Sequence, residues 1–244
     1  MLPTPSTSHV SYNTIYEPAE DSFLLLDTLA AHAEKEWLRN RFPSSTPSPL
    51  VTEIGTGSGV VIAFLAANAK VIFARDDLLV LGVDVNVLAC KATLTTVSKA
   101  ITEQGSRTIY LGSLCADISS TLQALLVDVL IFNPPYVPTS TLPAQPSREV
   151  SSDGDAFETV SKLLELSYAG GVDGMEITNR LLDELPRVLS KRGVAYVLLC
   201  RQNRPEEVKQ KIRVMGECWE VETVGRSGKV AGWEKLEVLR IWRT

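Results

Sequence analysis

The decapeptide LVTEIGTGSG, residues 50–59, joins a short apolar strand, 50–54, to a glycine-rich turn, 55–59. Residues 60–67, which follow it, are apolar on all sides and predict a buried helix. Such a turn lets the backbone approach a cofactor, and the helix behind it presents free N–H groups. The spacing is G-x-G-x-G, and Val60 stands where the dinucleotide fingerprint requires glycine. The segment therefore predicts the cofactor end of a parallel α/β sheet, and it weakens, without excluding, the prediction of a dinucleotide.

Strands and helices alternate along the rest of the chain. Further strands are expected at 78–85, 107–111, 127–132 and 194–200, and helices at 87–101, 119–126, 156–168, 177–189 and 205–215. A helix should also run from about residues 16–22 to Arg41, and segments 219–224 and 236–242 predict a terminal antiparallel pair. We predict a Rossmann-like, mostly parallel seven-stranded sheet with a terminal antiparallel strand and helices on both faces. The whole chain, 1–244, is expected to form one domain, with residues 1–15 as a loose tail.

Asp84 follows the second predicted strand, which lies next to the first in sheets of this kind. A carboxylate in that place can accept hydrogen bonds from both hydroxyls of a ribose. The alternative is a cap for the helix from Val87, a role that Asn86 can fill equally well. Dinucleotides and methyl donors share the ribose, so Asp84 does not choose between them.

The tetrapeptide Asn133-Pro134-Pro135-Tyr136 follows the fourth predicted strand, at the sheet edge where ligands of α/β proteins bind. Two prolines end the strand and make the turn rigid. We expect the turn to hold the Asn133 side-chain oxygen beside the Pro134 carbonyl oxygen. Both can then accept the hydrogens of an –NH₂ group and aim its lone pair at a sulfonium methyl group, while Tyr136 stacks on the planar group. The tetrapeptide predicts N-methylation; an ordinary proline-rich loop is the alternative.

Composition excludes other classes of function. A net charge of −5 and a pI near 5.2, without any basic run, argue against direct nucleic-acid binding. The four cysteines form no CxxC pair and the chain has two histidines, so neither a zinc site nor a disulfide framework is expected. No apolar stretch is long enough to span a bilayer. We expect a reducing compartment, the cytoplasm and also the nucleus, and no metal in the site.

The chain resembles the HemK-like glutamine methyltransferases, in the eukaryotic branch that methylates the Gly-Gly-Gln glutamine of the class-1 translation termination (release) factor. The segments that carry the resemblance span nearly the whole chain: 16–22 (YEPAEDS), 53–59, Asp84, Asn133 to Tyr136, 168–171 (YAGG) and 173–174 (DG). The resemblance implies S-adenosyl-L-methionine as the cofactor and Asn133, Pro134, Pro135 and Tyr136 as the catalytic residues.

The resemblance also implies a set of cofactor-binding residues. They are Tyr16, Glu20, Asp21, Ser22, Glu53, Gly55, Thr56, Gly57, Gly59, Asp84, Val85, Asp117 and Asn133. The glycines would line the methionine part, Asp84 would hold the ribose, and Asp117 would lie near the adenine amine. The side chains from the start of the N-terminal helix, Tyr16, Glu20, Asp21 and Ser22, would close over the cofactor, although a well-capped helix start explains them too.

The resemblance further implies a heterodimer with a small zinc-binding activator protein, which would cover an apolar face near residues 109–114. The segment 139–168 is longer than in the compact family pattern, and it lies where a substrate would be selected. Alternatives that the residues leave open are methylation of adenine N6 in a nucleic acid or of a protein lysine. A dinucleotide-dependent oxidoreductase and an inactive binding scaffold are alternatives of another class.

Overall fold

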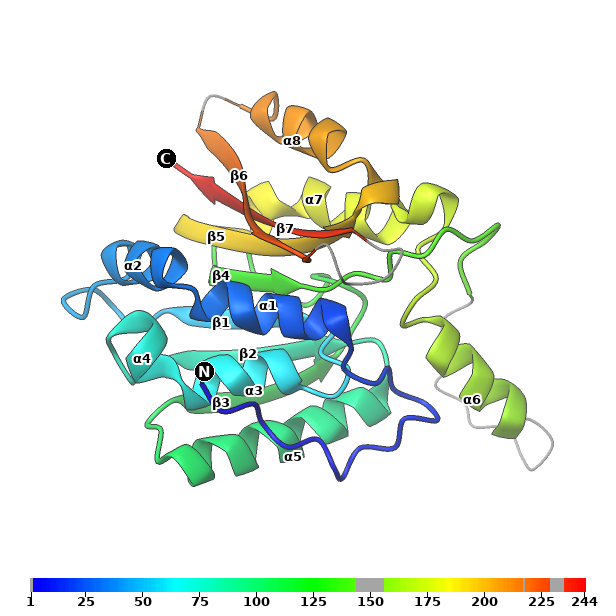
Figure 1. Cartoon of the computed structure of the whole chain (residues 1–244), viewed down its shortest axis with the longest axis horizontal. Helices are drawn as coiled ribbons and strands as arrows, with labels where there is room; N and C mark the ends of the chain where they lie inside the picture. The colour runs from blue at the N-terminus through cyan, green and yellow to red at the C-terminus, as the bar shows by residue number, and fades with distance from the viewer. Residues whose placement is uncertain (1, 144–155, 217, 229–234) are drawn as a thin grey trace.

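A seven-stranded sheet runs through the centre of the molecule (Figure 1). The computed structural model describes residues 2–143, 156–216, 218–228 and 235–244. The strands are β1 (Leu50–Ile54), β2 (Leu79–Asp84), β3 (Ile109–Cys115), β4 (Val127–Phe132), β5 (Leu189–Cys200), β6 (Trp219–Arg226) and β7 (Leu236–Arg243). Their spatial order is β3-β2-β1-β4-β5-β7-β6. Pairs from β3 to β5 are parallel, whereas β7 is antiparallel to both β5 and β6. The predicted fold class is confirmed.

The strand order reverses at β1, which pairs with β2 on one side and with β4 on the other. The loops after β1 and β4 therefore leave the sheet in neighbouring positions and open a crevice at its carboxyl edge. Both segments in which the sequence predicted chemistry, the glycine turn and the Asn-Pro-Pro-Tyr tetrapeptide, follow these two strands. The topology thus brings them together.

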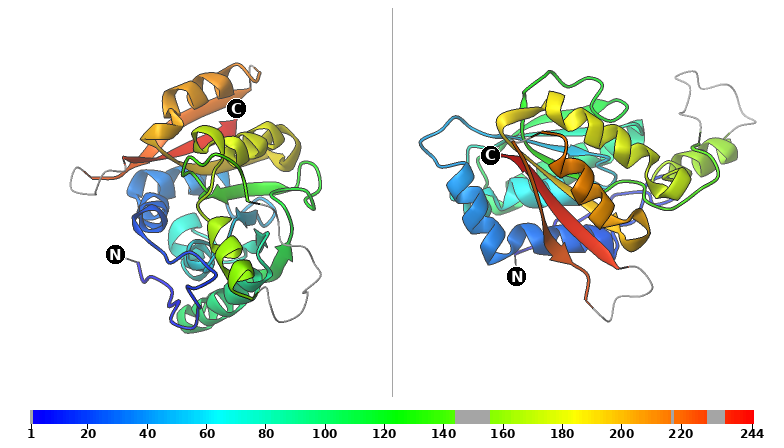
Figure 2. Two further views of the ribbon diagram at one scale, coloured as in Figure 1. Left: turned by 90° about the vertical axis from the view of Figure 1, so that its right-hand side faces the viewer. Right: turned by 90° about the horizontal axis from the view of Figure 1, so that it is seen from above.

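Helices cover both faces of the sheet, because side chains of a strand point alternately to either side. Val129 and Ile131 of β4 belong to one core cluster, and Leu130 and Phe132 belong to the other. The first cluster packs under α1 (Glu20–Ala30), α2 (His32–Arg41), α3 (Val60–Ala67), α4 (Ala69–Phe73) and α5 (Val87–Gln104). The second packs under α7 (Glu176–Val188) and α8 (Pro205–Arg213). Helix α6 (Ala156–Glu165) lies apart from both layers, as the views in Figures 1 and 2 agree.

Several element boundaries differ from the sequence-based predictions. The helix expected to run to Arg41 is two helices, because Ala31 adopts an extended conformation between α1 and α2. No helix forms at 119–126: Leu125 has a left-handed backbone, and the N–H groups of Leu125 and Leu126 bond to carbonyls at the end of α7. Tertiary hydrogen bonds thus replace helical ones there. Strand β3 begins and ends later than expected, β5 begins earlier, and α4 was not predicted.

The N-terminal segment is not a loose tail in the structure. Val10 and Ile15 are buried and pack with Ala89 of α5. The Asn86 side chain donates to the Thr14 carbonyl oxygen over 2.8 Å, in a buried position. This anchorage places residues 14–16 at the crevice. None of the described helices is long and apolar enough to cross a membrane.

Candidate active site

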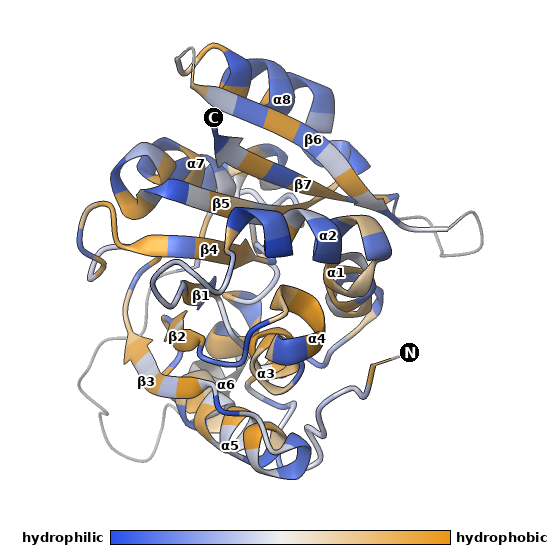
Figure 3. Cartoon of the chain, turned by 90° about the vertical axis from the view of Figure 1, so that its left-hand side faces the viewer, coloured by the Kyte–Doolittle hydropathy of each residue, from blue (hydrophilic) through white to orange (hydrophobic). Residues whose placement is uncertain are grey.

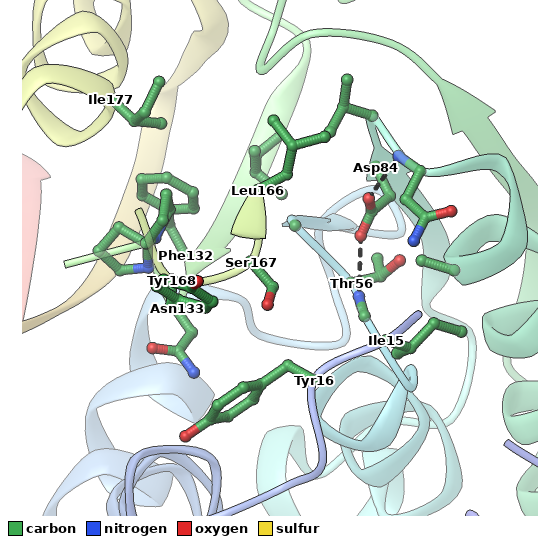
Figure 4. A pocket seen from close by; sticks show the side chains of 18 of the residues that line it. Ile15, Tyr16, Thr56, Asp84, Phe132, Asn133, Leu166, Ser167, Tyr168 and Ile177 are labelled. Atoms are coloured by element: carbon green, nitrogen blue, oxygen red, sulfur yellow. Dashed lines mark hydrogen bonds between the residues drawn. The ribbon is translucent and has the colours of Figure 1, made fainter. Parts of the chain in front are cut away.

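A pocket of about 320 Å³ opens at the carboxyl ends of β1, β2 and β4 (Figure 4). Most of the predicted site residues line it: Tyr16, Asp21, Ser22, Glu53, Gly55, Thr56, Gly57, Asp84, Val85, Asp117, Asn133, Pro134, Pro135 and Tyr136. The structure therefore brings together segments that are more than a hundred residues apart in the sequence. Glu20 and Gly59 are the two predicted residues that do not line the pocket.

Asp84 fixes the glycine turn from the end of β2. Its carboxylate accepts the Gly57 N–H over 2.9 Å and the Asn86 N–H over 2.8 Å, as the dashed lines in Figure 4 show. Burial raises the pKa of Asp84, and these N–H donors lower it in part. The helix-capping alternative for Asp84 is not what the structure shows, because the Asn86 side chain accepts the Leu88 N–H and caps α5. Asp84 thus faces the pocket as an acceptor.

Glu53 lies on β1 behind the glycine turn and is buried. Its carboxylate accepts the N–H of Ile62, in the first turn of α3, over 3.0 Å. Burial raises the pKa of Glu53 well above its usual value, and the nearby charge of Asp84 raises it further. The free N–H end of α3, where a dinucleotide would place its pyrophosphate, therefore already has an acidic partner from the chain itself. This arrangement disfavours an anionic ligand group there.

Gly59 and Glu20 do not line the pocket, and the structure gives each of them other surroundings. A side chain at Gly59, where φ is +78°, would lie 2.7 Å from the Thr93 Cα atom, so glycine is required there for α3 to approach α5. The glycine pattern alone could not separate this packing role from a binding role. Glu20 is exposed in the first turn of α1, where its charge complements the helix dipole.

Asn133 stands at the end of β4 with the two ends of its amide in different surroundings. The Nδ2 group donates to Asp21 Oδ2 over 3.1 Å. The Oδ1 atom is buried and has no hydrogen-bond partner among the described residues. Buried polar atoms without partners are uncommon in folded proteins, and Asn133 is among the residues that line the pocket, so its oxygen is a candidate acceptor for a ligand hydrogen. Asn133 therefore offers an acceptor to whatever enters.

The backbone of the tetrapeptide is held from behind by residues far away in the sequence. The Asn203 side chain, which is buried, donates to the Tyr136 carbonyl oxygen over 3.2 Å and to the Asp173 carbonyl oxygen over 3.1 Å. A side chain at Gly174, where φ is +68°, would overlap the Tyr136 carbonyl oxygen. Sequence reasoning predicted turns at the glycines but missed Asn203, because a single asparagine after a strand carries no recognisable signal. The loop after β4 is thus held in place by contacts to the Tyr136 carbonyl oxygen.

The wall of the pocket beyond Asn133 is mostly apolar. It includes Phe132 and Ile177 together with Leu166 and Tyr168, which follow α6 (Figure 4). Leu166, Tyr168 and Ile177 were not predicted to line the pocket, since their place depends on a long connection returning to the sheet edge. Asp117, at the far end, pairs with Arg180 of α7 over 2.5 Å. Apolar walls around one acceptor suit a planar, uncharged group that carries N–H hydrogens.

Comparison with known proteins gives relatives over the whole length, although no family model matches the chain. Methyltransferase HEMK2 of Mus musculus is 34% identical over 246 residues, which cover 98% of this chain and 96% of that protein. The eRF1 methyltransferase catalytic subunit mtq2 of Schizosaccharomyces pombe is 31% identical, covering 100% of this chain and 96% of that protein. The solved N-terminal domain of human METTL16, in complex with SAH, aligns with a TM-score of 0.56 at 13% identity, covering 94% of this chain and 72% of that chain. That likeness shows a shared fold.

Proposed function

This chain belongs to the HemK-like methyltransferase family that includes HEMK2 and the eRF1 methyltransferases, and on that premise we propose its reaction. It transfers a methyl group from S-adenosyl-L-methionine to the side-chain amide nitrogen of a glutamine. The acceptor is the glutamine of the Gly-Gly-Gln motif in the eukaryotic class-1 release factor. The observation that carries the proposal is the buried Asn133 Oδ1 atom, which has no hydrogen-bond partner among the described residues and belongs to the same pocket as the apolar wall.

The charges of the pocket fit this methyl donor better than a dinucleotide. Glu53 and Asp84 are buried carboxyl groups that line the pocket, and burial raises the pKa of each by disfavouring its charged form. A cation placed near them would offset that cost and favour the ionised carboxylates. A pyrophosphate would instead meet Glu53 at the start of α3. S-adenosyl-L-methionine would supply a methyl group carried on a positive sulfonium. The nitrogen lone pair would form the new N–CH₃ bond as the C–S bond breaks, its electron pair would stay on sulfur as a neutral thioether, and the amide would lose one proton to solvent.

The residues of this chain supply position rather than a strong base. Asn133 Oδ1 accepts one hydrogen of the glutamine –NH₂ group, which orients the nitrogen and favours the positive charge that develops on it. Tyr136 and Tyr168 line the pocket around the planar amide and exclude water from it. Gly55 and Gly57 hold positive φ angles that let the backbone approach the methionine part of the donor. Asp84 accepts from the ribose.

The exposed face of β3 supports a protein partner. β3 is an edge strand of the sheet and carries hydrophobic residues (Figure 3). The side chains of its residues Ile109 and Leu111 are 56% and 53% exposed. An apolar edge strand invites pairing or burial by another chain. We propose that the small zinc-binding activator protein covers this face. Leu111→Lys should then prevent co-purification with the activator, whereas Val214→Lys, at an exposed site after α8, should not.

Mass spectrometry tests the reaction directly. The full chain, co-expressed with the activator, is incubated with S-adenosyl-L-methionine and the release factor. We expect one added methyl group on the Gly-Gly-Gln glutamine, and none with Asn133→Ala. Absence of this modification, with the cofactor still bound, would overturn the assignment of the acceptor and leave protein lysine and nucleic-acid adenine to be tested.

A further inference from the structure

The orientation of the Asn133 amide depends on a residue in another part of the fold. The two ends of a primary amide have nearly the same shape, so packing alone selects poorly between the oxygen and the nitrogen. Only the oxygen can accept a hydrogen from a substrate –NH₂ group. Some neighbouring group must therefore decide which end of Asn133 faces the pocket.

Asp21 is placed to make that selection. It lies in the first turn of α1, is buried, and its Oδ2 atom accepts the Asn133 Nδ2 group over 3.1 Å. An ionised carboxylate accepts hydrogen bonds and donates none. A flipped amide would set the Asn133 oxygen against the carboxylate oxygen and lose the bond, so the nitrogen must face Asp21. The Asn133 oxygen is then left unpartnered among the residues that the structure describes.

Asp21 is itself held in place by its neighbour in the chain. Its other oxygen, Oδ1, accepts the Ser22 N–H over 2.6 Å and the Ser22 hydroxyl over 3.3 Å. Both residues are buried at the start of α1, where the helix dipole favours a negative charge. The Oδ2 atom therefore has a fixed direction toward Asn133. The start of α1 and the end of β4, 112 residues apart, form one hydrogen-bonded unit.

We propose that Asp21 is a positioning residue, which orients the Asn133 amide with its oxygen toward the acceptor nitrogen. This inference rests on the proposed function, because it assigns Asn133 the role of acceptor for the substrate –NH₂ group. It also differs from the expectation that Asp21 serves the cofactor. A cofactor ligand would change cofactor affinity when replaced, whereas a positioning residue changes the rate of turnover.

The first experiment compares single variants of the chain co-expressed with its activator. Asp21→Ala frees the amide to rotate, and we expect kcat on the release factor to fall roughly 10- to 100-fold. The dissociation constant for S-adenosyl-L-methionine, measured by calorimetry, should change less than about threefold. Asp27→Ala, on the exposed side of the same helix, is the matched control and should keep the parent rate. A parent rate for Asp21→Ala, or a loss of cofactor affinity that equals the loss of kcat/KM, overturns the proposal.

The second experiment exchanges the two partners. Asn133→Asp alone sets two carboxyl groups against each other and should lose more activity than Asp21→Ala. In the double variant Asp21→Asn/Asn133→Asp the amide and the carboxylate change places, so a donor again faces an acceptor. We expect the double variant to recover at least about tenfold over Asn133→Asp, since the bond that orients the acceptor is restored. Losses that add together in the double variant contradict the proposal.

A measurement without substrate separates this inference from the proposed function. In the parent, the Asn133 side-chain amide should show slow hydrogen exchange by ¹⁵N NMR, and its signal is identified by its absence in Asn133→Ala. Asp21→Ala should abolish that protection, and Asp27→Ala should not. If the parent does not methylate the release factor but shows this pattern, the acceptor assignment fails and the orientation of Asn133 stands. An unprotected amide in the parent overturns the orientation itself.

Discussion

The cofactor side and the acceptor side of the pocket are built in different ways. The cofactor side comes from two consecutive strand–turn units, β1 and β2, whose polar groups are bonded to one another: Asp84 to Gly57, and Glu53 to Ile62. The acceptor side is centred on Asn133 and assembled from α1, the segment 166–177 and the turn after β5. It holds a buried oxygen that no described residue satisfies. These polar groups of the cofactor side have hydrogen-bond partners within the chain, whereas the Asn133 oxygen of the acceptor side is left for a substrate.

Replacing Asn133 should have the largest effect and should separate the two sides most clearly. Asn133→Ala removes the acceptor for the substrate –NH₂ group, and we expect kcat to fall roughly 10²- to 10³-fold. The dissociation constant for the cofactor should stay within about twofold, because the polar groups around Glu53 and Asp84 are untouched. Steady-state kinetics and calorimetry on the same preparation check both. Equal losses in both quantities would mean that the two sides are one unit.

A change behind the catalytic loop should be next in size. Gly174→Ala would force its side chain against the Tyr136 carbonyl oxygen, so the loop must move and activity should fall about 10-fold or more. Gly105→Ala, at the end of α5, is a matched control, because its φ is also positive at +61° and nothing lies within 4 Å of the added atom. Both variants carry a backbone strain of about 1–2 kcal/mol, which urea unfolding of Gly105→Ala measures alone and to which Gly174→Ala adds its contact with Tyr136. Only Gly174→Ala should lose kcat.

Two glycines of the same turn should respond differently to alanine. Gly59→Ala meets Thr93 at 2.7 Å and should lower the free energy of unfolding by about 1–3 kcal/mol, with the cofactor affinity of the folded protein little changed. Gly57→Ala has space for the added atom, so it should destabilise the protein less than Gly59→Ala. Gly57 lines the pocket and its N–H donates to Asp84, so its replacement should weaken cofactor binding more. If Gly59→Ala destabilises the protein less than Gly57→Ala, or weakens cofactor binding more, Gly59 would be a cofactor-binding residue as the sequence predicted.

These differences explain how far the sequence could be interpreted. The strand at 50–54 and the helix at 60–67 were predicted with the bounds that the structure has, because each is a short apolar run that borders the glycine turn. The same glycine pattern could not reveal that Gly59 packs against Thr93, since that contact depends on the angle between α3 and α5. Asn203 and Leu166 reach the site through long-range folding, which no local pattern records. Asp21 was named as a site residue, but its hydrogen bond to Asn133 becomes visible only when α1 is placed beside β4.

The smallest expected effect concerns the proton on Glu53. Burial raises the pKa of this carboxyl in the folded protein well above 4.5. At pH values between the unfolded and the folded pKa, the folded chain therefore holds a proton that the unfolded chain has released. The stabilising contribution of that proton is fully present below pH 4.5 and is lost as the pH rises through the higher, folded pKa. Glu53→Gln keeps an oxygen for the Ile62 N–H and does not titrate, so its advantage in urea unfolding over the parent should grow with pH and then level off. Glu103→Gln, exposed on α5, is the control.

An advantage for Glu53→Gln that does not change with pH would mean that the buried carboxyl stays in one protonation state. The same variant also tests the cofactor side of the comparison. If the carboxylate of Glu53 favours a cationic methyl donor, Glu53→Gln should bind S-adenosyl-L-methionine more weakly although the protein without cofactor is more stable. Glu53 would then lower the stability of the protein without cofactor and raise its affinity for the cofactor. A variant that is more stable and binds equally well would reduce Glu53 to a cap for α3.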